Sequence, residues 1–131
     1  MSHRKGHKPA GIRVYSDGGC HGKNQLNGPI WGSFKVGDLP IETVEFDVLG
    51  SNNVAEYLTA IAAMEYCRDK GIKPDKFLTD SMLVAYHING WLDCNDERLY
   101  PLCEKARLLL VELGSHIDWT CRDNIVRVLG H

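Results

Sequence analysis

Three carboxylates in this sequence, Asp17, Glu56 and Asp80, lie where a strand or a helix is expected to end or begin. Each has an ordinary structural explanation. Asp17 and Gly18 have the composition of a tight turn, and Asp80 could cap the helix that follows it. Asn53 and Glu56 have the spacing of a helix capping box. Taken together, the three acids suggest a different role, because clustered carboxylates bind hard divalent cations.

The elements that must position these acids follow from the periodicity of the apolar residues. The expected elements, in order, are strands 11–16, 31–36 and 44–48, helix 53–70, strand 76–79, helices 81–88 and 99–113, and strand 116–121. The third strand alternates strictly between apolar and charged residues, which indicates that one of its faces is buried. The predicted order is therefore βββαβααβ.

This order predicts an α/β fold with a mixed five-stranded sheet. Three strands joined by short connections lie antiparallel, whereas the strand after the first helix can return parallel to the first strand by a right-handed crossover. If these two strands are neighbours, Asp17 and Asp80 end side by side, and Glu56 reaches the same point from the helix. Two divalent cations about 4 Å apart at such a cluster would suit phosphodiester hydrolysis.

Several stretches resemble ribonuclease H of type 1 (ribonuclease HI), in the protrusion-lacking subgroup of the ribonuclease-H-like superfamily. The matching stretches are Tyr15-Ser16-Asp17-Gly18-Gly19, Asn53-Val54-Ala55-Glu56-Tyr57, Leu78-Thr79-Asp80-Ser81, Leu99-Tyr100-Pro101-Leu102 and, more weakly, Trp119-Thr120-Cys121-Arg122-Asp123-Asn124. The resemblance implies three antiparallel strands followed by parallel strands, flanked by helices. It also implies a metal-dependent endoribonuclease that cleaves the RNA strand of RNA·DNA hybrids with two Mg²⁺ or Mn²⁺ ions and leaves a 5′-phosphate.

The resemblance also assigns roles to single residues. Asp17, Glu56 and Asp80 match the metal-binding acids of the family, which are also its catalytic residues. The positions that it assigns to hybrid binding are Cys20, Asn52, Asn53 and Arg122. The first three match residues that touch the minor groove, where the 2′-hydroxyls distinguish RNA from DNA. Arg122 matches an arginine beside the metals that assists turnover, and Asn53 has an alternative as the helix cap.

The sequence departs from the family pattern in three places. Segment 92–97 is short and acidic where other members carry a Lys-rich protrusion, and Met82 stands where a glutamine is common. The family has a fourth aspartate in a last helix, but residues 125–131 contain no carboxylate. His131 is a tentative replacement as a metal ligand. The alternatives are Asn124 brought in by a different loop course, a site of three acids, or a His131 that is only a poorly ordered chain end.

Composition limits the partners of this protein. At 131 residues with 44% hydrophobic content, the chain predicts one domain over residues 11–131, preceded by a flexible segment over residues 1–10. The net charge of −2 gives no global attraction to nucleic acid, so binding needs local positive groups. The candidates are Arg4, Lys5, Lys8, Lys23 and Arg122. We expect a monomer.

Cysteine usage and hydropathy indicate the compartment. The five cysteines form no Cys-x-x-Cys pair, and an odd number without a signal segment predicts free thiols in the cytoplasm. No apolar stretch is long enough to span a membrane. An alternative function is a non-catalytic RNA- or hybrid-binding module on the same fold, which Met82 and the missing fourth acid would permit. A junction resolvase or a 3′ exonuclease would need a different constellation of acids.

Overall fold

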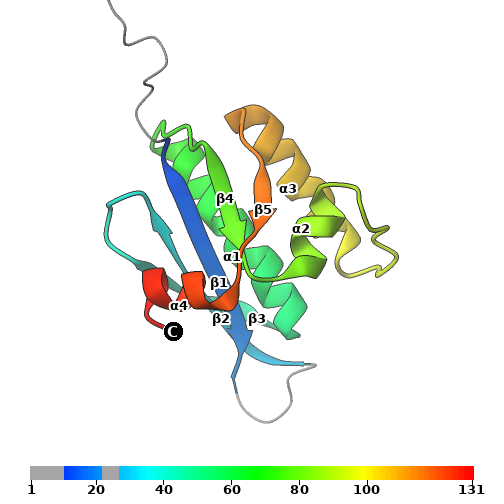
Figure 1. Cartoon of the computed structure of the whole chain (residues 1–131). Coiled ribbons are helices and arrows are strands. Elements are labelled where there is room, and N and C mark those ends of the chain that lie inside the picture. Colours follow the sequence, from blue (N-terminus) through cyan, green and yellow to red (C-terminus); the bar gives the residue numbers. More distant parts are fainter. Residues whose placement is uncertain (1–10, 22–26) are drawn as a thin grey trace, which may run out of the picture.

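A five-stranded mixed sheet forms the centre of the fold in the computed structural model, which describes residues 11–21 and 27–131 (Figure 1). The strands are β1 (Arg13–Cys20), β2 (Gly28–Val36), β3 (Glu42–Gly50), β4 (Lys76–Thr79) and β5 (Ile117–Trp119). The helices are α1 (Asn52–Asp69), α2 (Met82–Ile88), α3 (Tyr100–Leu113) and α4 (Arg122–Leu129). The strand order is β3-β2-β1-β4-β5. The first three strands pair antiparallel, and β4 and β5 extend the sheet in parallel from β1, which confirms the predicted fold class.

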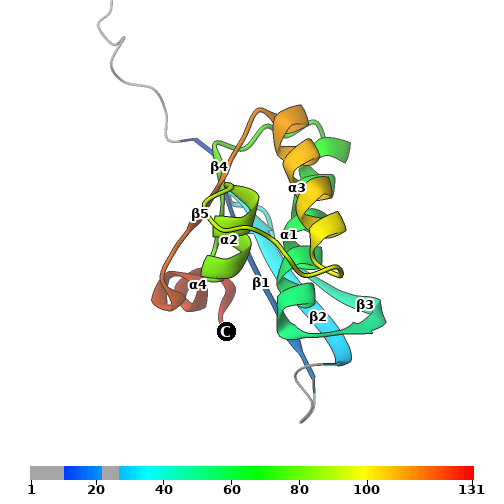
Figure 2. The same ribbon diagram turned by 90° about the vertical axis from the view of Figure 1, so that its right-hand side faces the viewer.

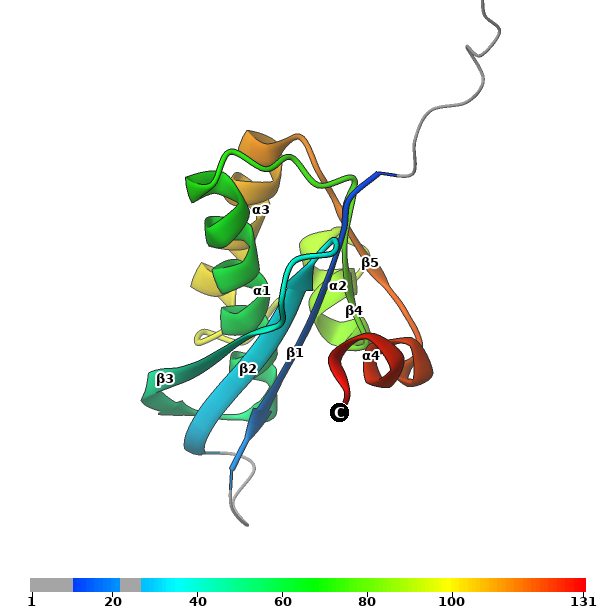
Figure 3. The ribbon, with the colours of Figure 1, turned by 90° about the vertical axis from the view of Figure 1, so that its left-hand side faces the viewer.

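Helices cover the sheet unequally. α1 and α3 pack side by side on one face, and α4 lies on the opposite face, against β1 and β2 (Figures 2 and 3). The main core fills the space between the sheet and α1. Its largest fully buried side chains include Tyr57 and Met64 from α1 and Phe77 from β4. Because β1 and β4 are central strands and α1 packs directly on them, the three predicted acids are carried by the best-packed part of the fold.

The first strand is longer than the sequence predicts. β1 continues through Asp17 to Cys20 and pairs with β2 along its whole second half, so Asp17 lies inside the strand. The prediction that Asp17 ends the strand is therefore wrong, as is the alternative of a tight turn at Gly18. The two glycines do not break this strand because β2 pairs with them and α1 packs closely over Gly18.

Serines, not the acids, cap the helices of the site. The Ser51 hydroxyl accepts a hydrogen bond from the backbone N–H of Val54 at 3.2 Å and begins α1. The Ser81 hydroxyl does the same for α2 at the same distance. Each such cap contributes about 1 kcal/mol to helix stability. The capping alternatives for Asn53 and Asp80 are thus wrong, and their side chains are not used to begin the helices.

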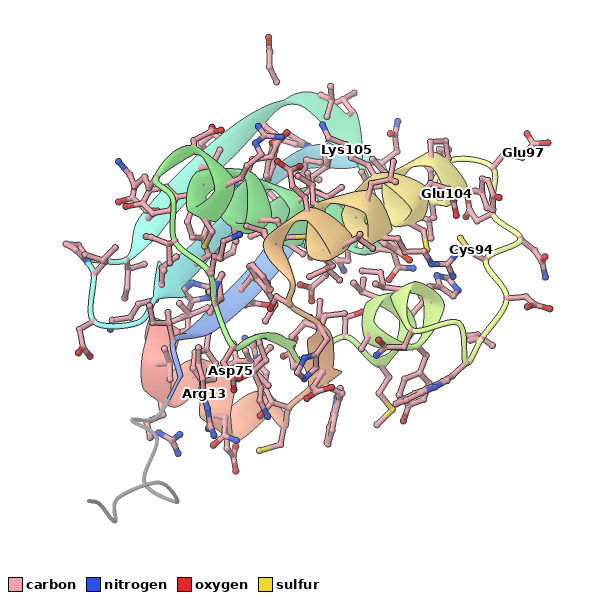
Figure 4. All side chains as sticks on the ribbon, turned by 90° about the horizontal axis from the view of Figure 1, so that it is seen from above. Arg13, Asp75, Cys94, Glu97, Glu104 and Lys105 are labelled. Carbon is pink, nitrogen blue, oxygen red and sulfur yellow. The ribbon has the colours of Figure 1, made fainter. Side chains whose placement is uncertain are left out.

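One helix is absent from the predicted order. α4 directly follows the last strand, and the apolar periodicity behind the βββαβααβ order did not predict it. Between α2 and α3, residues 89–99 form a connection without a helix, and Figure 4 shows Cys94 and Glu97 along it. The place where other members carry a basic protrusion is therefore occupied by a short loop.

Some expectations lie outside the described residues. These are the flexible segment 1–10 and the basic candidates Arg4, Lys5, Lys8 and Lys23. All five cysteines lie within the described ranges, and none of them forms a disulfide. In residues 11–21 and 27–131, no helix has the length and apolar character needed to cross a bilayer.

Candidate metal centre

The three predicted acids meet at one point. Asp17 from the middle of β1, Glu56 from α1 and Asp80 from the end of β4 each offer a carboxylate oxygen, and these oxygens all lie within 4.8 Å of one another. Asp17 is buried, and the other two are partly buried. Among the described residues, this is the one group of acids, histidines and cysteines with the spacing of a metal site.

Two glycines allow Glu56 to reach the strand that carries Asp17. A side chain at Gly32 would come within 1.8 Å of the Thr59 hydroxyl, and one at Gly18 would come within 2.5 Å of the Ala55 carbonyl oxygen. Helix and sheet therefore touch at their backbones. The N–H of Gly18 then donates a hydrogen bond of 3.1 Å to the Glu56 carboxylate. This bond fixes the orientation of the acid above the strand.

The electrostatics of the cluster favour a bound cation. Burial, and then the charges of Asp17 and Asp80, raise the pKa of Glu56 well above its usual value. Burial also raises the pKa of Asp17, and the neighbouring Asp80 adds to this, although a hydrogen bond from Arg122 opposes the shift. Both shifts mean that the protein compensates the negative charge incompletely. A divalent cation with oxygen ligands supplies the missing charge, so the donor set fits Mg²⁺ or Mn²⁺.

Arg122 bridges two of the acids. Its guanidinium donates hydrogen bonds of 3.0 Å to Asp17 Oδ2 and 2.9 Å to Asp80 Oδ2. These bonds raise the pKa of Arg122. More than half of the arginine side chain is exposed, whereas both acids are nearly covered. The arginine thus reaches into the cluster from the solvent side, from the first residue of α4.

His131 lies on the other side of Asp17. Its Nδ1 is 3.2 Å from Asp17 Oδ2, and its Nε2 forms a 2.6 Å hydrogen bond with the hydroxyl of Ser33 on β2. The chain reaches this place because Gly130, at φ 83°, ends α4 in a left-handed turn. The His131 ring thus has two polar partners, Asp17 on β1 and Ser33 on β2. Asn124 donates instead to the Thr120 hydroxyl at 2.8 Å.

Three of the four residues predicted to touch a hybrid, Cys20, Asn52 and Asn53, lie near the acids on β1 and α1, and the fourth, Arg122, is on α4. The backbone N–H of Cys20 donates a 2.9 Å hydrogen bond to the side-chain oxygen of Asn52. This bond joins the end of β1 to the beginning of α1, where Asn53 follows. Met82, at the beginning of α2, is half exposed two residues after Asp80. Cys20, Asn52, Asn53 and Met82 therefore approach the candidate metal centre from three elements, β1, α1 and α2.

Sequence reasoning missed three side chains around the site. Ser33 and Trp31 from β2 hold the ring of His131, and Trp119 donates from its indole nitrogen to the backbone oxygen of Asp80 at 3.2 Å. No local pattern in the sequence pointed to Ser33. On β2 it alternates with the buried Ile30 and Phe34, and only the register of β1 and β2 sets it opposite Asp17.

Comparison with known proteins also points to ribonuclease H. No family model matches the chain. Ribonuclease HI of Halobacterium salinarum is 32% identical over 111 residues, which cover 83% of this chain and 54% of that protein. The chain therefore spans about half the length of this curated relative.

Solved structures match over nearly the whole chain. Ribonuclease H1 from the same archaeon has a TM-score of 0.76 at 28% identity, over 88% of this chain and 89% of that one. LC11-RNase H1, which was isolated from compost and solved in complex with an RNA/DNA hybrid, shares the fold with a TM-score of 0.76 at 22% identity, over 88% and 89% of the two chains.

The sheet order and the three converging acids define a protein of the ribonuclease-H-like superfamily. Within it, the chain is similar to ribonuclease HI of Halobacterium salinarum. The short loop at 89–99 agrees with the subgroup that lacks the basic protrusion.

Proposed function

We propose that this protein is an endoribonuclease that hydrolyses the RNA strand of RNA·DNA hybrids with two divalent metal ions and leaves 5′-phosphate products. The observation that carries the proposal is the cluster of Asp17, Glu56 and Asp80, whose carboxylate oxygens lie within 4.8 Å of one another. Similarity to ribonuclease HI and to solved ribonuclease H1 structures supports the choice of substrate.

The three acids would hold the ions, Mg²⁺ or Mn²⁺, because their oxygens are close together and incompletely neutralised. When bound, a pair of such ions activates the attacking water and stabilises the leaving oxygen. Asp17 is central to this arrangement, since it contacts both Arg122 and His131 through one oxygen. His131 is the proposed fourth ligand, in the place where the family has an aspartate.

The other residues of the site would bind the hybrid. Cys20, Asn52 and Asn53 lie on the side of the acids where β1 ends and α1 begins, within reach of a minor groove that exposes 2′-hydroxyls. Arg122 is exposed enough to contact a phosphate and would neutralise charge beside the ions. With a net charge of −2 and no protrusion, binding should be modest and should weaken steeply with salt.

The same proposal includes the oligomeric state of the protein and its cellular location. We expect a monomer that acts in the cytoplasm, where thiols stay reduced, because an odd number of cysteines with no Cys-x-x-Cys arrangement favours a reducing compartment.

The test is incubation of the purified protein with a hybrid labelled on its RNA strand, with Mg²⁺, with Mn²⁺ and with chelator. We expect 5′-phosphate products with either metal and none with chelator. Double-stranded DNA of the same sequence should remain intact. Binding of the hybrid without cleavage under every metal condition would instead support the alternative, a non-catalytic hybrid-binding module. Equal cleavage of the DNA duplex would refute the proposed substrate.

A further inference from the structure

The ring of His131 is held on three sides. Nδ1 faces Asp17 Oδ2 at 3.2 Å, Nε2 is 2.6 Å from the hydroxyl of Ser33, and the ring of Trp31 stands edge-on at 4.9 Å between centroids. Ser33 is almost completely buried, at 1% exposure, so its hydroxyl position is fixed by the packing of β2. About one third of the His131 side chain remains exposed. Three neighbours thus define the orientation of the ring beside Asp17.

The spacing of His131 and Asp17 suits a shared ion. Two neighbouring ligands of an octahedral ion are about 3.0 Å apart when each metal–ligand distance is about 2.1 Å. The observed 3.2 Å between His131 Nδ1 and Asp17 Oδ2 is close to that value. The imidazole therefore needs little movement to become a ligand beside Asp17.

Ser33 has the right chemistry to orient this ring. A histidine that binds metal through Nδ1 carries its proton on Nε2, and that N–H then needs an acceptor. Without metal, Nδ1–H can donate to Asp17, and Nε2 then needs a donor. A serine hydroxyl both donates and accepts, so Ser33 can hold the ring in the same orientation in either tautomer. An alanine at this position could do neither.

We propose that Ser33, supported by Trp31, is a positioning residue that aims His131 Nδ1 at the metal shared with Asp17. This inference deepens the proposed function and rests on its assignment of His131 as the fourth ligand. Ser33 does not touch the metal or the substrate. Its effect passes entirely through the ring of His131, and this distinguishes it from a serine that only stabilises the sheet.

The test is a double-mutant cycle on metal affinity, with Ser33→Ala, His131→Ala and the double variant. Mn²⁺ is the probe because Mg²⁺ dehydrates reluctantly and strongly prefers oxygen ligands. Binding is measured by the loss of the free Mn²⁺ signal in electron paramagnetic resonance, without substrate. Because outer hydrogen bonds to metal ligands typically matter by 10–100-fold, we expect Ser33→Ala to weaken Mn²⁺ binding about tenfold. In the His131→Ala background, the same substitution should change it by less than about twofold.

Thermal unfolding of all variants is recorded in parallel, so that a loss of folded protein is not counted as a loss of affinity. Equal effects of Ser33→Ala in both backgrounds would overturn the proposal, because Ser33 would then act on the fold and not through His131. Unchanged affinity in both His131→Ala and Ser33→Ala would overturn it as well. The hybrid-cleavage assay tests the proposed activity separately. If Ser33→Ala and His131→Ala are coupled in Mn²⁺ binding but the protein does not cut hybrids, the activity is refuted and the positioning role of Ser33 stands.

Discussion

The two halves of the metal centre are built differently. Asp17, Glu56 and Asp80 are carried by β1, α1 and β4, which share a core containing fully buried Val14, Ala55 and Phe77. Arg122 and His131 come from the two ends of α4, a helix of eight residues that buries only Ile125 and Leu129. The first half is fixed by close packing of backbone against backbone, and the second by polar contacts with the first.

Because they are built differently, the two halves are expected to have different roles. The core half brings three carboxylates together, and their mutual repulsion and burial destabilise the charged forms, as the raised pKa of Glu56 indicates. The α4 half supplies a guanidinium and an imidazole that respond to that charge. We therefore expect substitutions in the core half to abolish function or change stability strongly, and substitutions in the α4 half to adjust rate and metal affinity.

The largest effect is expected for the acids themselves. Asp80→Asn removes a charged ligand while preserving shape, so cleavage of a labelled hybrid should fall by about 10³-fold or more, the equivalent of about 4 kcal/mol. Circular dichroism should show an unchanged fold. Asp118→Asn on the neighbouring strand is the matched control and should keep full activity. Near-full activity of Asp80→Asn would refute the assignment of the three acids.

A methyl group at Gly32 should break the packing that brings Glu56 to Asp17. The new carbon would lie 1.8 Å from the Thr59 hydroxyl, so α1 must move away from the sheet. We expect Gly32→Ala to lower the free energy of unfolding by about 2 kcal/mol or more, with a corresponding loss of activity. Gly19→Ala meets its nearest atom at 3.3 Å and should cost much less. Equal Tm values for the two variants would contradict this account.

Removal of the Arg122 guanidinium should lower the rate without unfolding the protein. We expect Arg122→Ala to reduce turnover roughly tenfold, the equivalent of about 1.4 kcal/mol. Its effect on stability should stay below about 1 kcal/mol, because more than half of the side chain is exposed. Arg122→Lys restores only part of the rate if one planar group must bridge Asp17 and Asp80. Full rescue by lysine would show that only the charge matters.

Glu56→Gln should stabilise the metal-free protein. The substitution removes a charge that burial and the two neighbouring acids disfavour, and the amide oxygen can still accept the hydrogen bond from Gly18. We expect a gain of about 1 kcal/mol, or roughly 4 °C in Tm, measured by thermal unfolding with chelator present. In wild type, added Mg²⁺ should raise the Tm, and in Glu56→Gln it should raise it much less. A lower Tm for the metal-free variant would contradict charge repulsion in the site.

The smallest effect concerns a buried pair behind the site. Tyr57 on α1 and His87 on α2 are hydrogen-bonded at 3.0 Å, and burial, with the charge of Arg107, lowers the pKa of His87. The unfolded chain therefore takes up a proton at a higher pH than the folded chain. Stability should be unaffected above about pH 6.5 and should fall as the pH drops below that value.

The measurement is urea unfolding between about pH 7.5 and about pH 5, compared with His87→Gln. The variant should be less stable at neutral pH and should show a weaker decline toward acid. An identical decline in both proteins would assign the pH dependence to other groups.

The sequence by itself was enough to predict which three acids converge and the order of most elements. The three acids and the βββαβααβ order were readable because apolar periodicity and short motifs are local signals. The pairing of β4 with β1 was only a condition of the prediction, and the fold supplies it. The exact strand ends and the helix caps were not readable. Asp17 lies inside β1 because β2 and α1 pack around Gly18, and this contact joins residues far apart in the chain.

Only the tertiary structure showed which side chain of the last residues lies beside the three acids. Residues 125–131 carry no acid, so the sequence left His131 as a tentative ligand, with Asn124, a three-acid site or a poorly ordered chain end as the alternatives. The fold places the His131 ring between Asp17 and Ser33, and it turns Asn124 toward Thr120. Ser33 itself has no motif, because its importance depends on the register that sets β2 against β1 and on the turn at Gly130. Such positions are defined by distance in space, and no local pattern in the chain encodes them.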